Sequence, residues 1–140
     1  MTYVIYFDFK KAFDSVSYSK LLTKIEAYGI TGDLLTWLRA FLNKRTQCVK
    51  LDHVISCELP VISGVHQGSV LGPTLFLIYI NDVIDIFRGL DVTPKLYADD
   101  NKLYSSYQFS KPTTDLDSAI LRLTEWSAKW QLGIAIDKCF

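Results

Sequence analysis

Aspartates carry the clearest chemical signal in this sequence of 140 residues. Asp8 follows an apolar segment, and Asp99 and Asp100 stand together between two other such segments. Carboxylates brought close together repel, and at low dielectric constant a divalent cation relieves the repulsion. Oxygen ligands without neighbouring His or Cys suit Mg²⁺ or Mn²⁺ rather than Zn²⁺. Two such ions about 4 Å apart could activate a hydroxyl and stabilise a leaving phosphate, if the fold brings these carboxylates together.

The patterning of apolar residues predicts the elements that carry these carboxylates. Residues 2–9 are β-branched and aromatic, which is typical of a strand. Apolar residues at helical spacing indicate four helices, and Gly29 is placed to end the first of them. The predicted strands are 2–9, 46–51, 54–59, 95–98, 102–107 and 133–137, and the predicted helices are 17–30, Thr31 to Leu42, Leu71 or Thr74 to Phe87, and Thr113 or Thr114 to Trp130.

Without residues 15–66, the predicted order is β-α-β-β-α-β, the split βαβ (ferredoxin-like) arrangement of an α+β fold. In this topology the first and third strands are antiparallel neighbours, and the helices cover one face of the antiparallel sheet. Asp8 would then meet the Asp99-Asp100 turn at one edge of the sheet. Aspartate also favours ordinary hairpin turns, and this is the alternative explanation for Asp99-Asp100.

Composition restricts the classes of function. Lys plus Arg and Asp plus Glu both number 15, so the chain lacks the overall basic charge typical of nucleic-acid binding, and such a partner must be argued from local motifs. The 49% of hydrophobic residues predicts one globular domain, with no signal peptide and no run long enough to span a membrane. A turn at residues 52–53 would place Cys48 opposite Cys57. We expect free thiols and a reducing intracellular compartment, with a disulfide as the alternative.

Four motifs, in the same order, resemble those of reverse transcriptases. They are Asp8–Asp14 (DFKKAFD), Ser63–Pro73 (SGVHQGSVLGP), Tyr97–Asp100 (YADD), and the spaced Trp126 and Trp130 followed by Leu132 and Lys138. YADD alone would recur by chance, but the four motifs together extend over the whole chain. The strings KAFD, QGSVLGP and FLIYIND are most similar to the enzymes of non-LTR (LINE-like) retrotransposons, and less so to group II intron and retron enzymes.

The resemblance implies a polymerase palm whose helical and hairpin insertion belongs partly to the fingers. It implies that Asp8 and Asp99 are catalytic and bind two Mg²⁺ or Mn²⁺ ions, and that Asp100 completes the acidic cluster. The backbone carbonyl of Phe9 would be a further metal ligand beside the nucleotide. Phe13 would lie under the sugar of the incoming nucleotide and exclude a ribose 2′-hydroxyl, although an ordinary core position is the alternative for this ring.

The resemblance also assigns residues outside the acidic cluster. Gln67 and Gly68 would border the nucleotide pocket, with a plain loop before a helix as the alternative. Lys138 would be a catalytic charge partner of the triphosphate or a proton donor to the leaving pyrophosphate, with a solvated surface lysine as the alternative. The basic residues that could contact template or primer phosphates, or be simply solvated, are Lys10, Lys11, Lys44 and Arg45.

The chain departs from the family pattern at His66, where proline is usual. Histidine removes the fixed φ that proline would give to this loop and adds a titratable group. The spacing of His53 and His66 does not suit a metal site, so neither histidine is assigned a role. The three tryptophans, Trp37, Trp126 and Trp130, lie on apolar helix faces and are predicted to pack in the core.

Residues 1–140 are therefore predicted to form a partial reverse transcriptase domain, the palm with part of the fingers, lacking the N-terminal fingers and the thumb. Its predicted function is to add dNTPs to a DNA primer 3′-hydroxyl on an RNA template by two-metal phosphoryl transfer. Alone, the fragment is predicted to be inactive or weakly active. Two alternatives stay open: an inactive retroelement relic that at most binds RNA or a protein partner, and another metal-dependent enzyme on this core, such as a nucleotide cyclase.

Overall fold

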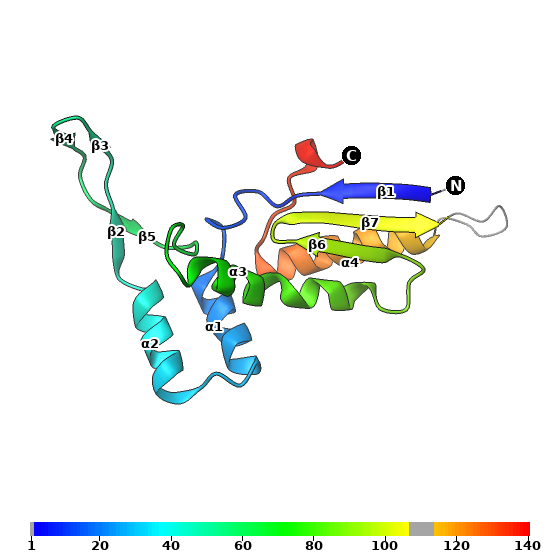
Figure 1. Ribbon diagram of the computed structural model, residues 1–140, viewed down its shortest axis with the longest axis horizontal. Helices are drawn as coiled ribbons and strands as arrows, with labels where there is room; N and C mark the ends of the chain where they lie inside the picture. Colours follow the sequence, from blue (N-terminus) through cyan, green and yellow to red (C-terminus); the bar gives the residue numbers. More distant parts are fainter. Residues whose placement is uncertain (1, 107–113) are drawn as a thin grey trace.

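The computed structural model describes residues 2–106 and 114–140, and Figure 1 shows how their elements are arranged. Tyr107, the predicted end of one strand, and Thr113, one predicted helix start, lie outside these ranges. The elements in chain order are β1 (Thr2–Phe7), α1 (Tyr18–Ala27), α2 (Gly32–Leu42), β2 (Arg45–Gln47), β3 (Lys50–Leu51), β4 (Val54–Ile55), β5 (Leu59–Val61), α3 (Gly72–Ile80), the 3-10 helix η1 (Asn81–Phe87), β6 (Thr93–Tyr97), β7 (Asp100–Ser106), α4 (Thr114–Trp130) and the 3-10 helix η2 (Ile136–Lys138).

The central sheet has the strand order β1-β7-β6, and both pairings are antiparallel. Phe7 pairs with Asn101 in the last rung between β1 and β7. Asp8 directly follows Phe7, and Asp99 and Asp100 directly precede Asn101. The first and third strands of the split βαβ core are therefore neighbours, as predicted, and Asp8 lies beside the Asp99-Asp100 turn.

The strand predicted at 133–137, the fourth of the split βαβ core, does not form as a regular strand, so this prediction is wrong. Ile134 forms an isolated antiparallel bridge with Phe9, and η2 then turns the chain. Ile134 packs against the core, but Ile136, two residues further on, is 78% exposed, so the two residues do not share a buried sheet face. The segment still runs along the outer edge of β1, where Phe140 exchanges two backbone hydrogen bonds of 2.8 and 3.2 Å with that strand.

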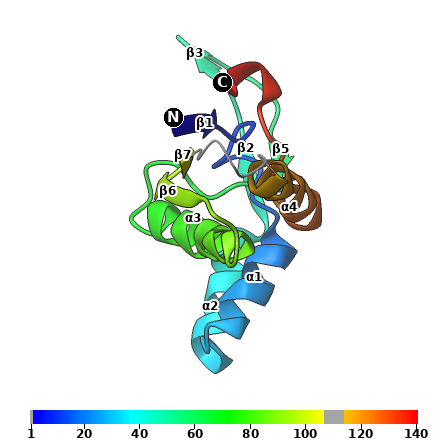
Figure 2. The same cartoon turned by 90° about the vertical axis from the view of Figure 1, so that its right-hand side faces the viewer.

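Helices α3 and α4 lie on the same side of the sheet, and α1 and α2 extend away from it beyond α3 (Figures 1 and 2). The core between these layers contains Phe7 and Leu103 from the sheet and Phe76 and Tyr79 from α3, all of them at most 5% exposed. The helices predicted at 17–30 and from Thr31 to Leu42 are present as α1 and α2. Within the described residues, no helix is both long enough and apolar enough to cross a membrane.

The helix predicted to continue to Phe87 changes type at Ile80, where α3 gives way to the 3-10 helix η1. The Lys24 ammonium, from α1, donates to the backbone carbonyl of Tyr79 and to Oδ1 of Asp82 at 2.5 Å. A carbonyl occupied by this ammonium is less available for the regular α-helical hydrogen bond, which is consistent with tightening of the chain at this point.

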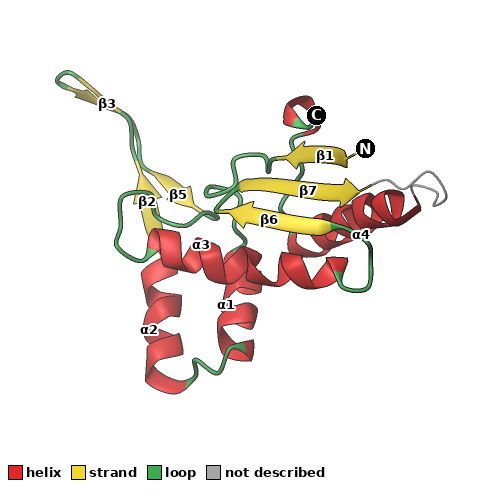
Figure 3. Cartoon of the chain, turned by 45° about the vertical axis from the view of Figure 1, so that its right-hand side comes forward, coloured by secondary structure: helices red, strands yellow, loops and turns green. Residues whose placement is uncertain are grey.

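The segment from β2 to β5 forms a hairpin that projects from the rest of the molecule (Figure 3). At its tip Leu51 pairs with Val54 across the predicted two-residue turn, and at its base Gln47 pairs with Leu59. The second strand has one residue more than the first between these rungs, which interrupts the ladder as a β-bulge does. Cys48 and Cys57 lie in this interruption and do not pair as predicted, although both are free thiols and exposed.

The tryptophans divide between core and surface. Trp126 is 5% exposed and Trp130 is partly buried, as predicted. The prediction for Trp37 is wrong, because its side chain is 53% exposed on α2 and stacks on the neighbouring Phe41 at 5.7 Å between ring centroids. Helical spacing predicted an apolar face at this position, but in the described residues nothing covers this face.

Candidate active site

The end of β1 places Asp8 within reach of Lys138. Oδ2 of Asp8 accepts a hydrogen bond from Nζ of Lys138 at 2.7 Å, although 130 residues separate them. The main chain holds both groups in position, because the amide of Ala135 donates to the carbonyl of Asp8 at 2.8 Å. The hydrogen bond that Lys138 donates to Asp8 raises the pKa of the Lys138 ammonium, and the charge of Asp99 acts in the same direction. Lys138 is thus a cation held at the acidic end of the sheet.

The turn between β6 and β7 positions the other two carboxylates. Ala98 has a φ of 52°, in the left-handed region, which costs a non-glycine residue about 1 kcal/mol. The side-chain amide of Asn101, which is 2% exposed, donates to the carbonyl of Asp99 at 2.7 Å and fixes the turn from within the core. Asp99 and Asp100 face different hollows, since Asp100 shares its hollow with Tyr6 and Lys102.

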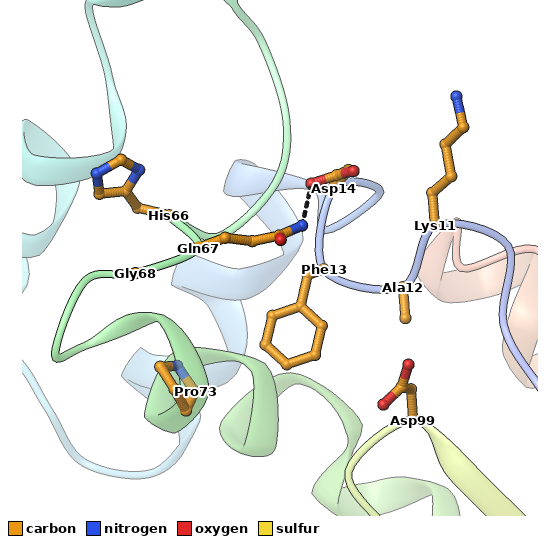
Figure 4. Close-up of a pocket in the computed structure, with 9 residues that line it drawn as sticks. All are labelled: Lys11, Ala12, Phe13, Asp14, His66, Gln67, Gly68, Pro73 and Asp99. Carbon is orange, nitrogen blue, oxygen red and sulfur yellow. Dashed lines mark hydrogen bonds between the residues drawn. The ribbon is translucent and has the colours of Figure 1, made fainter.

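A pocket of about 450 Å³ lies between the Asp8–Asp14 segment, the loop before α3 and the β6–β7 turn. Figure 4 shows Phe13 between the loop that carries His66 to Pro73 and Asp99, with Gln67 extending toward Asp14. The lining residues are Lys11, Ala12, Phe13, Asp14, His66, Gln67, Gly68, Pro73 and Asp99. Of the predicted site residues, the structure therefore brings Phe13, Gln67, Gly68 and Asp99 together around one cavity.

Two side-chain contacts give this pocket its shape. The ring of Phe13 stacks on Phe76 of α3, with centroids 4.2 Å apart and planes inclined by 18°. Phe13 therefore packs against the core, which was the alternative prediction for this ring, and it also lines the pocket. Nε2 of Gln67 donates to Oδ1 of Asp14 at 2.8 Å, which fixes the amide over the cavity.

The loop that carries Gln67 needs glycine at two close approaches. A Cβ on Gly64, whose φ is 92°, would lie 2.8 Å from the Cα of Asp14, and a Cβ on Gly72 would lie 2.3 Å from the carbonyl oxygen of His66. Neither distance is possible for a real side chain, so only glycine lets the loop pack in this way. The amide of Val65 also donates to the carbonyl of Phe13 at 2.8 Å, which joins the loop to the Phe13 segment.

The three predicted metal-binding carboxylates do not converge on one point. Across residues 2–106 and 114–140, no group of three or more Asp, Glu, His or Cys side chains is placed to hold a metal ion. Asp8 is engaged by Lys138, and Asp100 faces the hollow next to Tyr6. The bridge between Phe9 and Ile134 uses the carbonyl of Asp8 and the amide of Lys10, and leaves the Phe9 carbonyl out of both hydrogen bonds.

Sequence reasoning missed two residues of this site. Asp14 closes the DFKKAFD motif but received no role, and it is the partner of Gln67. Arg45 was noted only as part of a charge run, and its Nη2 lies 2.7 Å from Nδ1 of His66. The motif itself could have drawn attention to Asp14. No sequence signal pairs Arg45 with His66, because their contact depends on where the hairpin returns.

A split βαβ sheet that presents aspartates beside a pocket of nucleotide size has the architecture of a polymerase palm. The family model described as reverse transcriptase (RNA-dependent DNA polymerase) matches residues 1–140, the whole chain. The chain belongs to this family, and it is a reverse transcriptase domain of the non-LTR retrotransposon type, as its motifs predicted.

Curated relatives include mobile-element polymerases from flies. The RNA-directed DNA polymerase from mobile element jockey of Drosophila melanogaster is 31% identical over 140 residues, and the probable RNA-directed DNA polymerase from transposon X-element of the same species is 31% identical over 137 residues. Each alignment covers 96% of this chain and 15% of the relative. The chain thus spans about 15% of the length of these relatives.

Solved telomerase structures share the fold. Apo telomerase from Candida tropicalis, truncated from its C-terminal domain, matches with a TM-score of 0.77 and 17% identity over 99% of this chain and 30% of that chain. Telomerase from Candida albicans, in complex with a TWJ fragment of telomeric RNA, matches with a TM-score of 0.76 and 14% identity over 99% of this chain and 27% of that chain. These likenesses support the α+β palm fold.

Proposed function

We propose that this chain is the palm, with part of the fingers, of an RNA-directed DNA polymerase that extends a DNA primer on an RNA template. The observation that carries the proposal is the pocket in which Phe13, Gln67, Gly68 and Asp99 meet, because these residues come from three separate motifs. In the proposed reaction the primer 3′-hydroxyl oxygen bonds to the α-phosphorus of a dNTP. The bond to the β-phosphate breaks, the hydroxyl loses its proton and pyrophosphate leaves.

In this proposal the incoming nucleotide occupies the pocket of about 450 Å³. The sugar would rest on one face of the Phe13 ring. The ring cannot move away from the sugar, because its other face stacks on Phe76. A ribose 2′-hydroxyl directed at that ring would therefore clash. The amide of Gln67, fixed by Asp14, would contact the nucleotide, and Gly68 would let the backbone approach closely.

The donor set suits a hard divalent cation, because Asp8, Asp99 and the Phe9 carbonyl offer only oxygen. We propose two Mg²⁺ or Mn²⁺ ions, which when bound would supply charge stabilisation to the hydroxyl and the leaving phosphate. Asp8 would have to exchange Lys138 for such an ion, and Asp100 would have to change its orientation to join. We therefore expect the acidic cluster to assemble only with nucleotide and primer-template.

Lys138 is proposed to act on the phosphate side of the reaction. Once Asp8 binds a cation, the Lys138 ammonium loses its partner and is free to approach the triphosphate. Its side chain is 62% exposed, so this movement needs no repacking of the core. A lysine ammonium is protonated at neutral pH even without the contact to Asp8, as a charge partner or proton donor must be.

In this proposal residues 1–140 are one part of a larger catalytic unit. The N-terminal fingers and the thumb of that unit would bind the template and the primer. The experiment places this chain in the jockey polymerase of Drosophila melanogaster, in exchange for the segment of that polymerase that aligns with it. We expect the chimera to extend a DNA primer on an RNA template with dNTPs and Mg²⁺. Asp99→Asn should reduce extension by at least 100-fold, on the order of the loss from one essential charge-stabilising group.

The matched control is Asp52→Asn at the hairpin turn, which removes the same charge far from the pocket, at a φ of 51° that asparagine tolerates. Undiminished extension by Asp99→Asn would contradict the metal assignment. No extension by the chimera, together with no Mn²⁺ binding by the 140-residue chain with or without primer-template and nucleotide, would favour the inactive relic. Phe13→Val should raise ribonucleotide incorporation, and no change in sugar selectivity would contradict the role of Phe13.

A further inference from the structure

The loop from Ser63 to Ser69 carries Gln67 over the pocket, and His66 precedes Gln67 directly. Proline would hold this point of the loop by fixing its φ, whereas histidine has no such internal constraint. The loop is nevertheless well anchored at its other contacts. The carbonyl of His66 accepts both the amide of Ser69 at 3.2 Å and its hydroxyl at 2.8 Å.

The side chain of His66 is held by the projecting hairpin. Nη2 of Arg45, in β2, lies 2.7 Å from Nδ1 of His66. A guanidinium can only donate, so Nδ1 must accept and the imidazole proton must be on Nε2. The guanidinium of Arg45 also lies over the ring of Phe41, 6.0 Å from its centroid. Arg45 therefore joins α2, β2 and the loop before α3.

The next residue, Gln67, is hydrogen-bonded to a different part of the chain. Gln67 donates to the carboxylate of Asp14 at 2.8 Å, so consecutive loop residues are bonded to two different parts of the chain. Both His66 and Gln67 line the nucleotide-sized pocket, and both also line a neighbouring hollow of about 620 Å³ that includes Arg45. Together they form the wall between the two cavities, so movement of His66 would move Gln67.

We infer that Arg45 is a positioning residue, whose hydrogen bond to His66 supplies the constraint on the Gln67 loop that a proline would supply covalently. The inference rests on the proposed function, because Gln67 is placed at the nucleotide by that proposal. It couples the hairpin to the pocket, so the position of β2 sets the affinity for the incoming dNTP. The hydrogen bond acts before chemistry, and its loss should affect KM rather than kcat.

The test compares three variants of the jockey chimera: Arg45→Met, His66→Pro and the double variant. Arg45→Met should raise KM for dNTP about fivefold, the equivalent of one hydrogen bond, with kcat changed less than about twofold. His66→Pro should leave KM near the parent value, since within the described residues the His66 amide donates no backbone hydrogen bond that proline would remove. In the His66→Pro background, Arg45→Met should cause no further rise.

The matched control is Lys44→Met, which removes the neighbouring cation directly before β2 without touching His66. It measures how much of the Arg45 effect comes from weaker general attraction for nucleic acid. An equal rise of KM in Lys44→Met and Arg45→Met would overturn the inference. So would a fivefold effect of Arg45→Met that persists unchanged when residue 66 is proline.

A second measurement uses the 140-residue chain and needs no catalysis. Imidazole ¹⁵N shifts should show the Nε2-protonated tautomer of His66, and this preference should weaken in Arg45→Met. Amide hydrogen exchange at Ser69, whose amide donates to the His66 carbonyl at 3.2 Å, should become about fivefold faster in Arg45→Met, and His66→Pro should cancel the increase. Unchanged exchange would overturn the inference. A chimera without primer extension would contradict the proposed function instead, and the exchange rates would still decide the role of Arg45.

Discussion

The pair Lys24 and Asp82 offers a direct test of what holds the helices of this domain together. Lys24 is the charged side chain that is buried in the described ranges, with 4% of its surface exposed. Its ammonium lies 2.5 Å from Oδ1 of Asp82 and 3.8 Å from the ring centroid of Trp130. Burial lowers the pKa of Lys24, and the hydrogen bond to Asp82 opposes that effect. The pair joins α1 to η1 inside an aromatic enclosure.

The two partners should not contribute equally. In Asp82→Asn the ammonium stays buried without a counter-charge, which we expect to cost about 3 kcal/mol of unfolding free energy. In Lys24→Met the carboxylate of Asp82 keeps 33% exposure and its bond of 3.1 Å from Nε1 of Trp126, so water and the indole compensate in part. We expect this loss to be about 2 kcal/mol. The double variant should also lose about 2 kcal/mol, because no charge is then left buried.

The assay is urea unfolding of the 140-residue chain at pH 7, with free energies taken from the midpoint and slope. Asp85→Asn is the matched control, because Asp85 of the same 3-10 helix forms an exposed ion pair with Arg88 at 2.8 Å, and the loss of that pair should cost less than about 0.5 kcal/mol. If Asp82→Asn cost no more than Asp85→Asn, or if the double variant lost the sum of the single losses, the reasoning from burial would be refuted.

Two further outcomes follow from local geometry. Gly72→Ala should destabilise the chain by at least about 2 kcal/mol and weaken the Gln67 loop, since its Cβ would lie 2.3 Å from the His66 carbonyl oxygen. Gly133→Ala, whose nearest contact would be 3.9 Å away, is the tolerated control in the same urea experiment. Burial raises the pKa of Tyr79 to about 12, so its hydroxyl stays protonated in the folded state when the unfolded tyrosine ionises near pH 10. Stability should therefore fall between pH 10 and 12, by up to about 1.4 kcal/mol per pH unit more than in Tyr79→Phe, and equal slopes would contradict this expectation.

Local patterns in the sequence were sufficient for most of the fold. The strand at β1, the helices α1, α2 and α4, and the β6–β7 hairpin all depend on apolar periodicity and turn residues within a short stretch of chain. Two predictions failed where a side chain stays uncovered. Ile136, in the strand predicted at 133–137, is 78% exposed, and Trp37, which was predicted to pack in the core, is 53% exposed.

The site divides in the same way. The meeting of Asp8 with the Asp99-Asp100 turn followed from topology, because antiparallel neighbours bring the end of one strand to the start of the next. The motifs also identified Phe13 and Gln67, which do line one pocket. The sequence could not predict that Asp100 points into a different hollow. This depends on the side of the tight turn toward which each carboxylate points.

The elements, their order and the kinds of side chain at the end of the sheet could be predicted from the amino-acid sequence, because they depend on periodicity and residue identity. The contacts of Lys138 with Asp8, of Arg45 with His66 and of Lys24 with Asp82 are visible only in the folded chain. Each of these contacts joins residues at least 21 positions apart. Such pairs form where separate elements pack, and the packing is set by the shape and burial of the whole core rather than by any local pattern.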